Sequence, residues 1–306
     1  LDMVCEKTPE SPHDFSRDPI RLVREGDWIR ADATTLGADN GVALALGATL
    51  AEDPGAKHPP LELLFTVDEE TGLTGAKRLE PGFVEGRLLI NLDSETEGMF
   101  TVGCAGGRDV QIERGLRFTP VPEGSRRVKV TVGGLTGGHS GIDIHRPRAN
   151  AIKLLARLLD VLLQDDAVRL MAVAGGTRRN AIPRDAWGQV ACPAERAPAL
   201  HRHVAEWDAP FRAEFPCETA LRLSIEDAPA PSSGPAAMSR EGGLAVVHLL
   251  LALPHGVAQM DPAFGDLVLT SSNLAITETT GAAQKIVTSQ RSLSRFGLDA
   301  MSGQVR

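Results

Sequence analysis

The sequence predicts an α/β domain followed by an α+β domain that contains an antiparallel sheet. Residues 1–107 alternate apolar helices with nearly continuous apolar strands, as in domains built on parallel sheets. Residues 108–306 contain longer strands in which apolar and polar side chains alternate, together with amphipathic helices. A chain of 306 residues is long enough for two ordinary domains. We therefore expect the domain boundary between residues 107 and 108.

The first predicted domain has two helices and two buried strands. Small and apolar residues predict a helix over 41–51, and a nearly continuous apolar run predicts a strand over 61–67. A short helix over 71–79 and a second apolar strand over 88–92 follow.

The second predicted domain begins with a strand over 127–132, where apolar and polar residues alternate with a period of two. A helix over 150–160 carries apolar residues at positions 151, 154, 155, 158 and 159, which form one stripe. The remaining expected elements are strands over 168–174, 181–192, 220–225, 266–278 and 284–292, and helices over 197–213 and 241–253. The segment 228–237 is rich in Pro, Ser, Gly and Ala, which predicts a loop or insertion.

Composition excludes several classes of function. The formal net charge of −8 leaves no basic surface for nucleic acid or an anionic membrane, so small solutes are the expected partners. The four cysteines, Cys5, Cys104, Cys192 and Cys217, have no spacing typical of a metal site or redox motif, which favours a reduced, cytoplasmic setting. The longest apolar stretch, residues 244–253, is too short to cross a membrane.

Acidic residues follow successive predicted strands and precede a predicted helix. Asp39 lies in a glycine-flanked loop, Glu69 and Glu70 follow the first apolar strand, and Asp93 follows the second. Each one alone can be explained as a helix cap or a solvated turn. Together they indicate a site for divalent metal ions, because the carboxyl ends of neighbouring parallel strands meet at one edge of the sheet.

Several segments together resemble the M20 co-catalytic metallopeptidases, in particular the aminoacyl-histidine (Xaa-His), PepD-like dipeptidases. The matching segments are Leu1-Asp-Met-Val4, Thr34-Thr-Leu-Gly-Ala-Asp-Asn-Gly41, Asp68-Glu-Glu-Thr-Gly72, Ile90-Asn-Leu-Asp-Ser-Glu95, Gly103-Cys-Ala-Gly-Gly107 and Gly137-Gly-His-Ser-Gly141, with shorter matches at Ser272-Asn-Leu and Arg291-Ser-Leu. The resemblance implies a zinc-peptidase-like catalytic domain over 1–107 and a lid and dimerisation domain over 108–306.

The resemblance assigns a role to each acidic residue. Asp39 is expected to bridge two zinc ions, with Asp93 binding one ion and Glu70 the other. Glu69 is expected to be the general base and acid. Asp2 is expected to orient a neighbouring histidine, since a carboxylate that accepts the second imidazole N–H fixes the tautomer.

The resemblance also implies a cis peptide bond between Asp39 and Asn40. In this family each zinc ion has one histidine ligand, and neither histidine is present between Leu1 and Arg306. We therefore expect the chain to be truncated at both ends, its catalytic domain to be incomplete, and its own peptidase activity to be little or none.

The lid of this family is a four-stranded antiparallel sheet with helices on one face. Within it, His139 corresponds to the histidine that stabilises the oxyanion of the tetrahedral intermediate. Asn180 and Arg291 correspond to residues that bind the substrate's backbone and terminal carboxylate. Judged without the resemblance, these are a histidine in a turn, an asparagine in a turn and a solvated arginine.

The function expected from these features is hydrolysis of dipeptides by a protein with two divalent metal ions, which the resemblance implies to be zinc. An Xaa-His substrate such as carnosine and a homodimer formed through the lid are implied by resemblance alone. Two alternatives remain open: another M20 hydrolase, such as an N-acyl-amino-acid deacylase, and a non-catalytic binding or dimerisation module.

Overall fold

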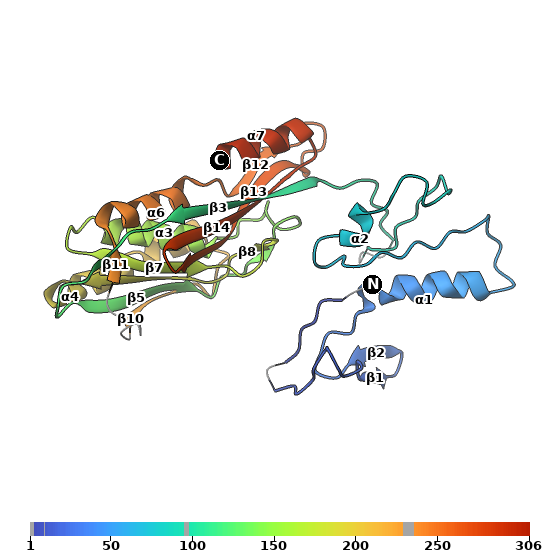
Figure 1. Ribbon diagram of the computed structural model, residues 1–306, viewed down its shortest axis with the longest axis horizontal. Coiled ribbons are helices and arrows are strands. Elements are labelled where there is room, and N and C mark those ends of the chain that lie inside the picture. The colour runs from blue at the N-terminus through green and yellow to red at the C-terminus, as the bar shows by residue number, and fades with distance from the viewer. Residues whose placement is uncertain (1–2, 9, 95–97, 229–235) are drawn as a thin grey trace. The chain divides into compact units, whose positions relative to one another are not determined.

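The computed structural model describes residues 3–8, 10–94, 98–228 and 236–306 (Figure 1). The chain divides into two compact units, Leu1–Val102 and Gly103–Arg306. The boundary expected between residues 107 and 108 falls inside the first strand of the second unit, β3 (Gly106–Gly115). Asp2 lies outside the described residues.

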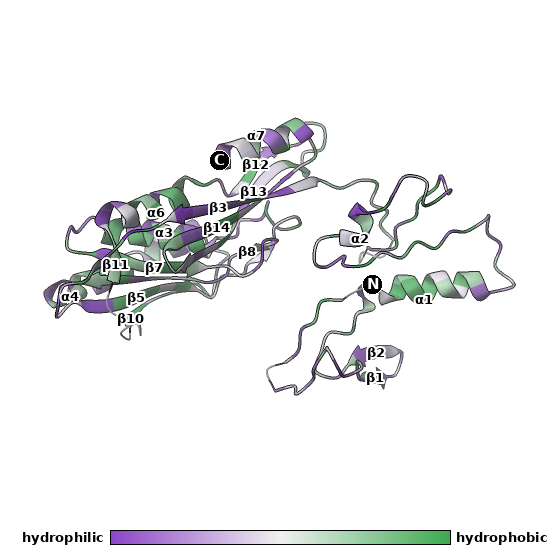
Figure 2. Cartoon of the chain, in the orientation of Figure 1, coloured by the Kyte–Doolittle hydropathy of each residue, from purple (hydrophilic) through white to green (hydrophobic). Residues whose placement is uncertain are grey.

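The first unit contains a hairpin and two helices. Strands β1 (Leu22–Glu25) and β2 (Trp28–Ala31) pair in antiparallel fashion around a tight turn at Gly26, whose φ of 63° is one that glycine adopts readily. Helix α1 (Ala38–Glu52) is apolar on nearly all sides, as its green colour in Figure 2 shows. Helix α2 (Thr74–Lys77) is shorter than the helix expected over 71–79.

The two apolar strands expected in the first unit are not formed among its described residues. Residues 61–67 and 88–92 have no strand partner there, and most of their large apolar side chains are exposed. Helix α1 packs close to the first segment, since a Cβ atom at Gly47 would lie 3.4 Å from Cδ2 of Leu63. An apolar run forms a buried strand only where other strands and helices cover it, and the described part of this unit supplies little cover.

The second unit is built on an antiparallel sheet. Among the described residues this sheet has eight strands, in the order β10-β5-β9-β7-β13-β14-β3, with β12 also paired to β13. The sheet expected by resemblance had four strands, so the observed one is larger. The strands of this unit are β3, β4 (Phe118–Pro120), β5 (Arg126–Gly133), β6 (Gly138–His139), β7 (Arg169–Gly175), β8 (Ala181–Ile182), β9 (Ala186–Cys192), β10 (Arg222–Asp227), β11 (Ala236–Met238), β12 (Gly256–Met260), β13 (Val268–Thr280) and β14 (Ala283–Ser292).

Helices α3 (Ala151–Leu162), α6 (Arg240–Ala252) and α7 (Arg295–Val305) lie along the sheet (Figure 1). The shorter helices α4 (Ala197–Glu206) and α5 (Asp208–Glu214) follow a single 3-10 turn at Ala194–Arg196. Helix α3 begins at Asn150, whose side-chain oxygen accepts hydrogen bonds from the backbone N–H groups of Ile152 (2.9 Å) and Lys153 (3.3 Å). Its apolar stripe packs on the alternating buried valines of β5, which forms the core predicted from periodicity.

Most elements expected in the second unit are observed within one to three residues. The helix expected over 197–213 is divided at Trp207 into α4 and α5, and the strand expected over 181–192 is divided into β8 and β9. Helix α7 and strands β3, β4, β6 and β12 were not expected. Most of the segment 228–237 lies outside the described residues, and β11 occupies its end.

Polar side chains fill the contact between β13 and β14 on one face of the sheet. Gln284 donates a hydrogen bond to Thr277 (2.7 Å) and accepts one from Thr279 (2.7 Å). Gln290 donates to Thr288 (2.7 Å) and Ser272 (3.3 Å). Apolar packing therefore shares this face with a network of specific hydrogen bonds.

The described residues include no helix long and apolar enough to cross a membrane.

Candidate functional site

Asp39 lies at an irregular start of helix α1. Its φ and ψ of −88° and 107°, and those of Asn40, are not helical, and the peptide bond between these two residues is cis, as predicted. Gly37 precedes them with a φ of 74°, which favours glycine. The regular helix thus begins only after Asn40, and Asp39 lies in the bend before it.

Asp93 lies next to this bend although it is far away in the sequence. The side-chain amide of Asn40 donates a hydrogen bond to Oδ1 of Asp93 (2.9 Å), and its oxygen accepts one from the backbone N–H of Ala43 (3.2 Å). One asparagine therefore links the first turn of α1 to Asp93. This contact brings the chain around Asp39 and Asp93 together, as the proposed shared metal site requires.

Glu69 and Glu70 occupy a tight turn before α2. The backbone N–H groups of Gly72 and Leu73 both donate to the carbonyl of Glu69 (3.1 Å each). Asp68 and Leu73, at the two ends of the turn, have φ values of 55° and 62°, which are uncommon for residues other than glycine. Such conformations are concentrated at functional sites, because local strain must be offset by the surrounding structure.

The described residues do not yet form a complete metal site. Across residues 3–8, 10–94, 98–228 and 236–306, no group of three or more His, Cys, Asp or Glu side chains is arranged to hold a metal ion. Asp39, Glu70 and Asp93 offer carboxylate oxygens, which suit divalent cations, but none of the three offers an imidazole. Their role as metal ligands stays a prediction.

In the second unit, the structure brings His139 and Asn180 together. His139 in β6 pairs with Ala181 in β8, and the carbonyl of Asn180 accepts a hydrogen bond from the backbone N–H of Ser140 (2.7 Å). These residues are about forty positions apart in the sequence, and the two short strands are what joins them.

Arg291 lies beside His139. A Cβ atom at Gly141 would be 3.0 Å from both Cε1 of His139 and Cζ of Arg291, so this glycine lies between the imidazole and the guanidinium. Burial and the positive charge of Arg291 lower the pKa of His139, against a smaller opposing effect of Asp143. This shift favours the neutral imidazole, which has one ring N–H to donate.

The side chains of His139 and Arg291 each retain unused hydrogen-bonding atoms. Nδ1 of His139 and Nε of Arg291 are buried and have no hydrogen-bond partner among the described residues. Two segments distant in sequence thus supply an imidazole and a guanidinium to one place, and the backbone of a third segment is joined to the same loop at Asn180. Such a set can bind a small molecule that carries a carboxylate and a carbonyl.

Asn273 is a further residue of this cluster, and no role was predicted for it from the sequence. It is 1% exposed in β13, and its amide donates to the carbonyls of Arg179 (3.3 Å) and Ala181 (2.8 Å), on either side of Asn180. Because both partners are carbonyls, the amide nitrogen must face them, and Oδ1 has no partner in the described part of the chain. In the sequence, its position within the short matching segment 272–274 could have identified it as part of the site.

The family model of a peptidase dimerisation domain of M20 type matches residues 130–217. The chain is 37% identical over 300 residues to the cytosol non-specific dipeptidase of Escherichia coli, covering 98% of this chain and 61% of that protein. It is similar to the crystal structure of aminoacylhistidine dipeptidase from Vibrio alginolyticus, with a TM-score of 0.76, 36% identity, and coverage of 99% of this chain and 62% of that one. The chain thus spans about three fifths of the relatives it matches. The structural similarity confirms the predicted fold class.

Proposed function

We propose that the chain is part of a metal-dependent dipeptidase of the M20 family. The observation that carries this proposal is the convergence of His139, Asn180 and Arg291 from three separate segments of the second unit. The names of both relatives, a non-specific dipeptidase and an aminoacylhistidine dipeptidase, support the same reaction class.

The first unit is proposed to hold the metal ions. Asp39 would be shared by two ions, proposed to be zinc, with Asp93 on one ion and Glu70 on the other. Bound divalent ions would supply a polarised water molecule at neutral pH. The Asn40–Asp93 hydrogen bond supports this assignment, because it joins the chain beside Asp39 to Asp93.

Glu69 is proposed to move the proton. A carboxylate next to a ligand residue is suited to take a proton from the attacking water and to return it to the leaving amine. Asp2 is proposed to orient a histidine ligand.

The second unit is proposed to recognise the substrate. The neutral His139 imidazole would donate a hydrogen bond to the oxyanion that forms as the peptide carbonyl is attacked. The guanidinium of Arg291 and the side chain of Asn180 would bind the free carboxylate of a dipeptide. The name of the Vibrio relative suggests an Xaa-His substrate such as carnosine, while that of the Escherichia relative suggests a broader range.

A homodimer and a cytoplasmic location belong to the same proposal. The dimerisation-domain match over 130–217 supports dimer contacts through the second unit, and the Escherichia relative is named for the cytosol. The same match supports the second candidate function, a dimerisation module without catalysis.

The test is hydrolysis of unblocked dipeptides by the full-length gene product loaded with zinc. We expect turnover of carnosine or alanyl-histidine, abolition by a chelator, and little hydrolysis of N-acetyl-histidine. Preference for the N-acetyl compound would favour a deacylase instead. Absence of turnover on all of these, with a dimer still present in sedimentation analysis, would favour the dimerisation module.

A further inference from the structure

The loop that follows His139 folds around the carboxylate of one residue, Asp143. Oδ2 of Asp143 accepts a hydrogen bond from the backbone N–H of His139 (3.0 Å). In the other direction, the backbone N–H groups of Ile142 (3.1 Å) and Asp143 (2.8 Å) donate to the carbonyl of His139. Both backbone polar groups of His139 are therefore held by its own loop.

Arg148 fixes the carboxylate that holds this loop. Its Nη1 is 3.1 Å from Oδ2 of Asp143 and also donates to the carbonyl of Gly137. The Arg148 guanidinium thus links Gly137 to the Asp143 carboxylate, which in turn binds the backbone of His139. The side chains of Asp143 and Arg148 are only 15% and 17% exposed, so solvent screens this pair less than a surface ion pair.

Gly138 is the residue that lets the pair approach. Its φ of 142° favours glycine, and a Cβ atom there would lie 2.6 Å from Oδ2 of Asp143 and closer still to Nη1 of Arg148. A side chain at this position would push the carboxylate and the guanidinium away from the backbone of His139. The glycine is thus a geometric requirement of the Asp143–Arg148 pair.

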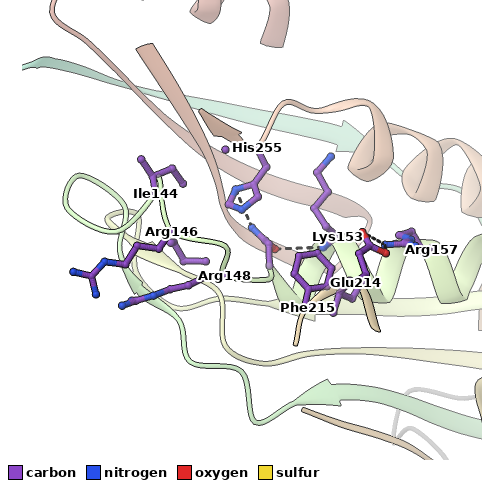
Figure 3. A pocket seen from close by; sticks show the side chains of 12 residues that line it. Ile144, Arg146, Arg148, Lys153, Arg157, Glu214, Phe215 and His255 are labelled. Atoms are coloured by element: carbon purple, nitrogen blue, oxygen red, sulfur yellow. Dashed lines mark hydrogen bonds and ion pairs between the residues drawn. The ribbon is translucent and has the colours of Figure 1, made fainter. Parts of the chain in front are cut away.

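A pocket next to Arg148 offers an alternative role for the charge of Arg148, which is to bind an anion there. This pocket of about 320 Å³ is lined by Arg146, Arg148, Lys153, Arg157 and His255, among others (Figure 3). Figure 3 shows Arg146 and Arg148 extending away from His255 and Lys153.

The cations around this pocket already have partners. Arg146 is 3.3 Å from Asp143, Arg157 contacts Glu214 (2.8 Å), and Lys153 donates to the carbonyls of Leu250 (2.9 Å) and Leu251 (2.8 Å). An anion in the pocket would have to displace these contacts. We therefore assign the charge of Arg148 to its contact with Asp143 in the His139 loop, and not to an anion in the pocket.

We propose that Asp143 and Arg148 are a positioning pair that fixes the imidazole of His139 beside Arg291. The charged groups that face His139 are Arg291 from β14 and Asp143 from the loop, with Arg148 behind Asp143. The consequence for catalysis rests on the proposed function. The positioning of the imidazole by this pair does not depend on the proposed function.

The first experiment observes His139 without requiring catalysis. The imidazole of His139 is followed by NMR in the parent protein, Asp143→Asn and Arg148→Lys, with assignment by His139→Gln. We expect both variants to shift its resonances, and Asp143→Asn to lower its pKa, because the Asp143 carboxylate stabilises the charged imidazole. Unchanged resonances and pKa in both folded variants would overturn the proposal.

The control is Arg157→Met. Arg157 lines the same pocket and also pairs with a carboxylate, but it does not contact the His139 loop. It should alter stability and leave the resonances of His139 unchanged. If Arg157→Met moves them as much as Asp143→Asn does, the effect is general loosening and the positioning role is refuted.

The second experiment measures dipeptide hydrolysis by the zinc-loaded full-length gene product and its variants. We expect Asp143→Asn to lower kcat about 10-fold or more with KM changed less than about 3-fold, because His139 would act on the transition state. We expect Arg148→Lys to keep more activity than Arg148→Met. An NMR shift without hydrolysis by the zinc-loaded full-length gene product would refute the proposed function and leave the positioning pair standing. An NMR shift with unchanged kcat would overturn its catalytic consequence.

Discussion

The two units contain similar apolar runs but treat them in opposite ways. In β5 of the second unit, Val128, Val130 and Val132 are completely buried beneath α3, with strands paired on both sides. In the first unit, Leu89 and Ile90 belong to an equally apolar run and are 85% and 80% exposed. The comparison teaches that apolar sequence supplies the tendency to be buried, while neighbouring elements decide whether burial occurs.

The largest expected effect compares the same substitution in both units. Leu155→Ala, at a fully buried position of α3, should lower the free energy of unfolding by about 2–5 kcal/mol, through lost burial and the cavity left behind. Leu89→Ala should change it by less than about 0.5 kcal/mol, as expected for an exposed side chain. Urea unfolding measures both. A cost at Leu89 equal to that at Leu155 would show that residues 88–92 are covered in solution.

Two glutamates allow the comparison to be made for polar groups. Glu218, 2% exposed, accepts hydrogen bonds from Thr136 N–H (2.7 Å), the Thr136 hydroxyl (2.8 Å) and Ala149 N–H (3.0 Å). Glu62 accepts from the N–H groups of Glu85 (2.9 Å) and Gly86 (3.2 Å) but is exposed.

Replacing each glutamate by alanine should lower the free energy of unfolding to a different extent in the two units. Glu218→Ala should cost about 2–4 kcal/mol, because buried donors lose their acceptor, and Glu62→Ala less than about 1 kcal/mol, because water replaces it. Equal costs in thermal or urea unfolding would contradict the difference in burial.

The smallest expected effect depends on pH. Burial, with a lesser contribution from Lys153, lowers the pKa of His255 to about 4, so the folded state favours its neutral form. The amide of Asn150 lies 3.3 Å from Nδ1 of His255 and donates to it, because the oxygen of that amide caps α3. This stability is present above pH 6.5 and is lost as the pH falls from 6.5 towards 4.

We expect the parent protein to lose about 2 kcal/mol from this residue between pH 7 and pH 5. His255→Gln should lack that part of the pH dependence, as measured by urea unfolding at several pH values. The same slope in both proteins would show that another group is responsible.

The sequence predicted much of the second unit because its patterns are local. Alternation over 127–132 and the stripe at 151–159 correspond to β5 and α3. Helix α7 was not expected because its sequence is rich in Gly and polar residues, although Ser294 caps it by accepting from Gly297 N–H. In the first unit, the apolar runs gave no information about which elements would cover them.

The candidate site divides in the same way. The resemblance identified His139, Asn180 and Arg291, which the structure brings together, and the cis bond after Asp39. Asn273 was not given a role because its importance arises from hydrogen bonds to the residues around Asn180, more than 90 positions earlier. The ligand roles of Asp39, Glu70 and Asp93, and that of Glu69 as general base, remain predictions.

The glutamine and threonine network between β13 and β14 also determines where Arg291 lies. Sliding one strand past the other by two residues would keep every side chain on its original face, so apolar packing alone opposes this error weakly. The same slide would separate Gln284 from Thr277 and Gln290 from Ser272. It would also carry Arg291 about 7 Å along the sheet, away from its place opposite Ser271. The buried polar pairs thus fix the register of β13 and β14. The position of the Arg291 guanidinium follows from that register.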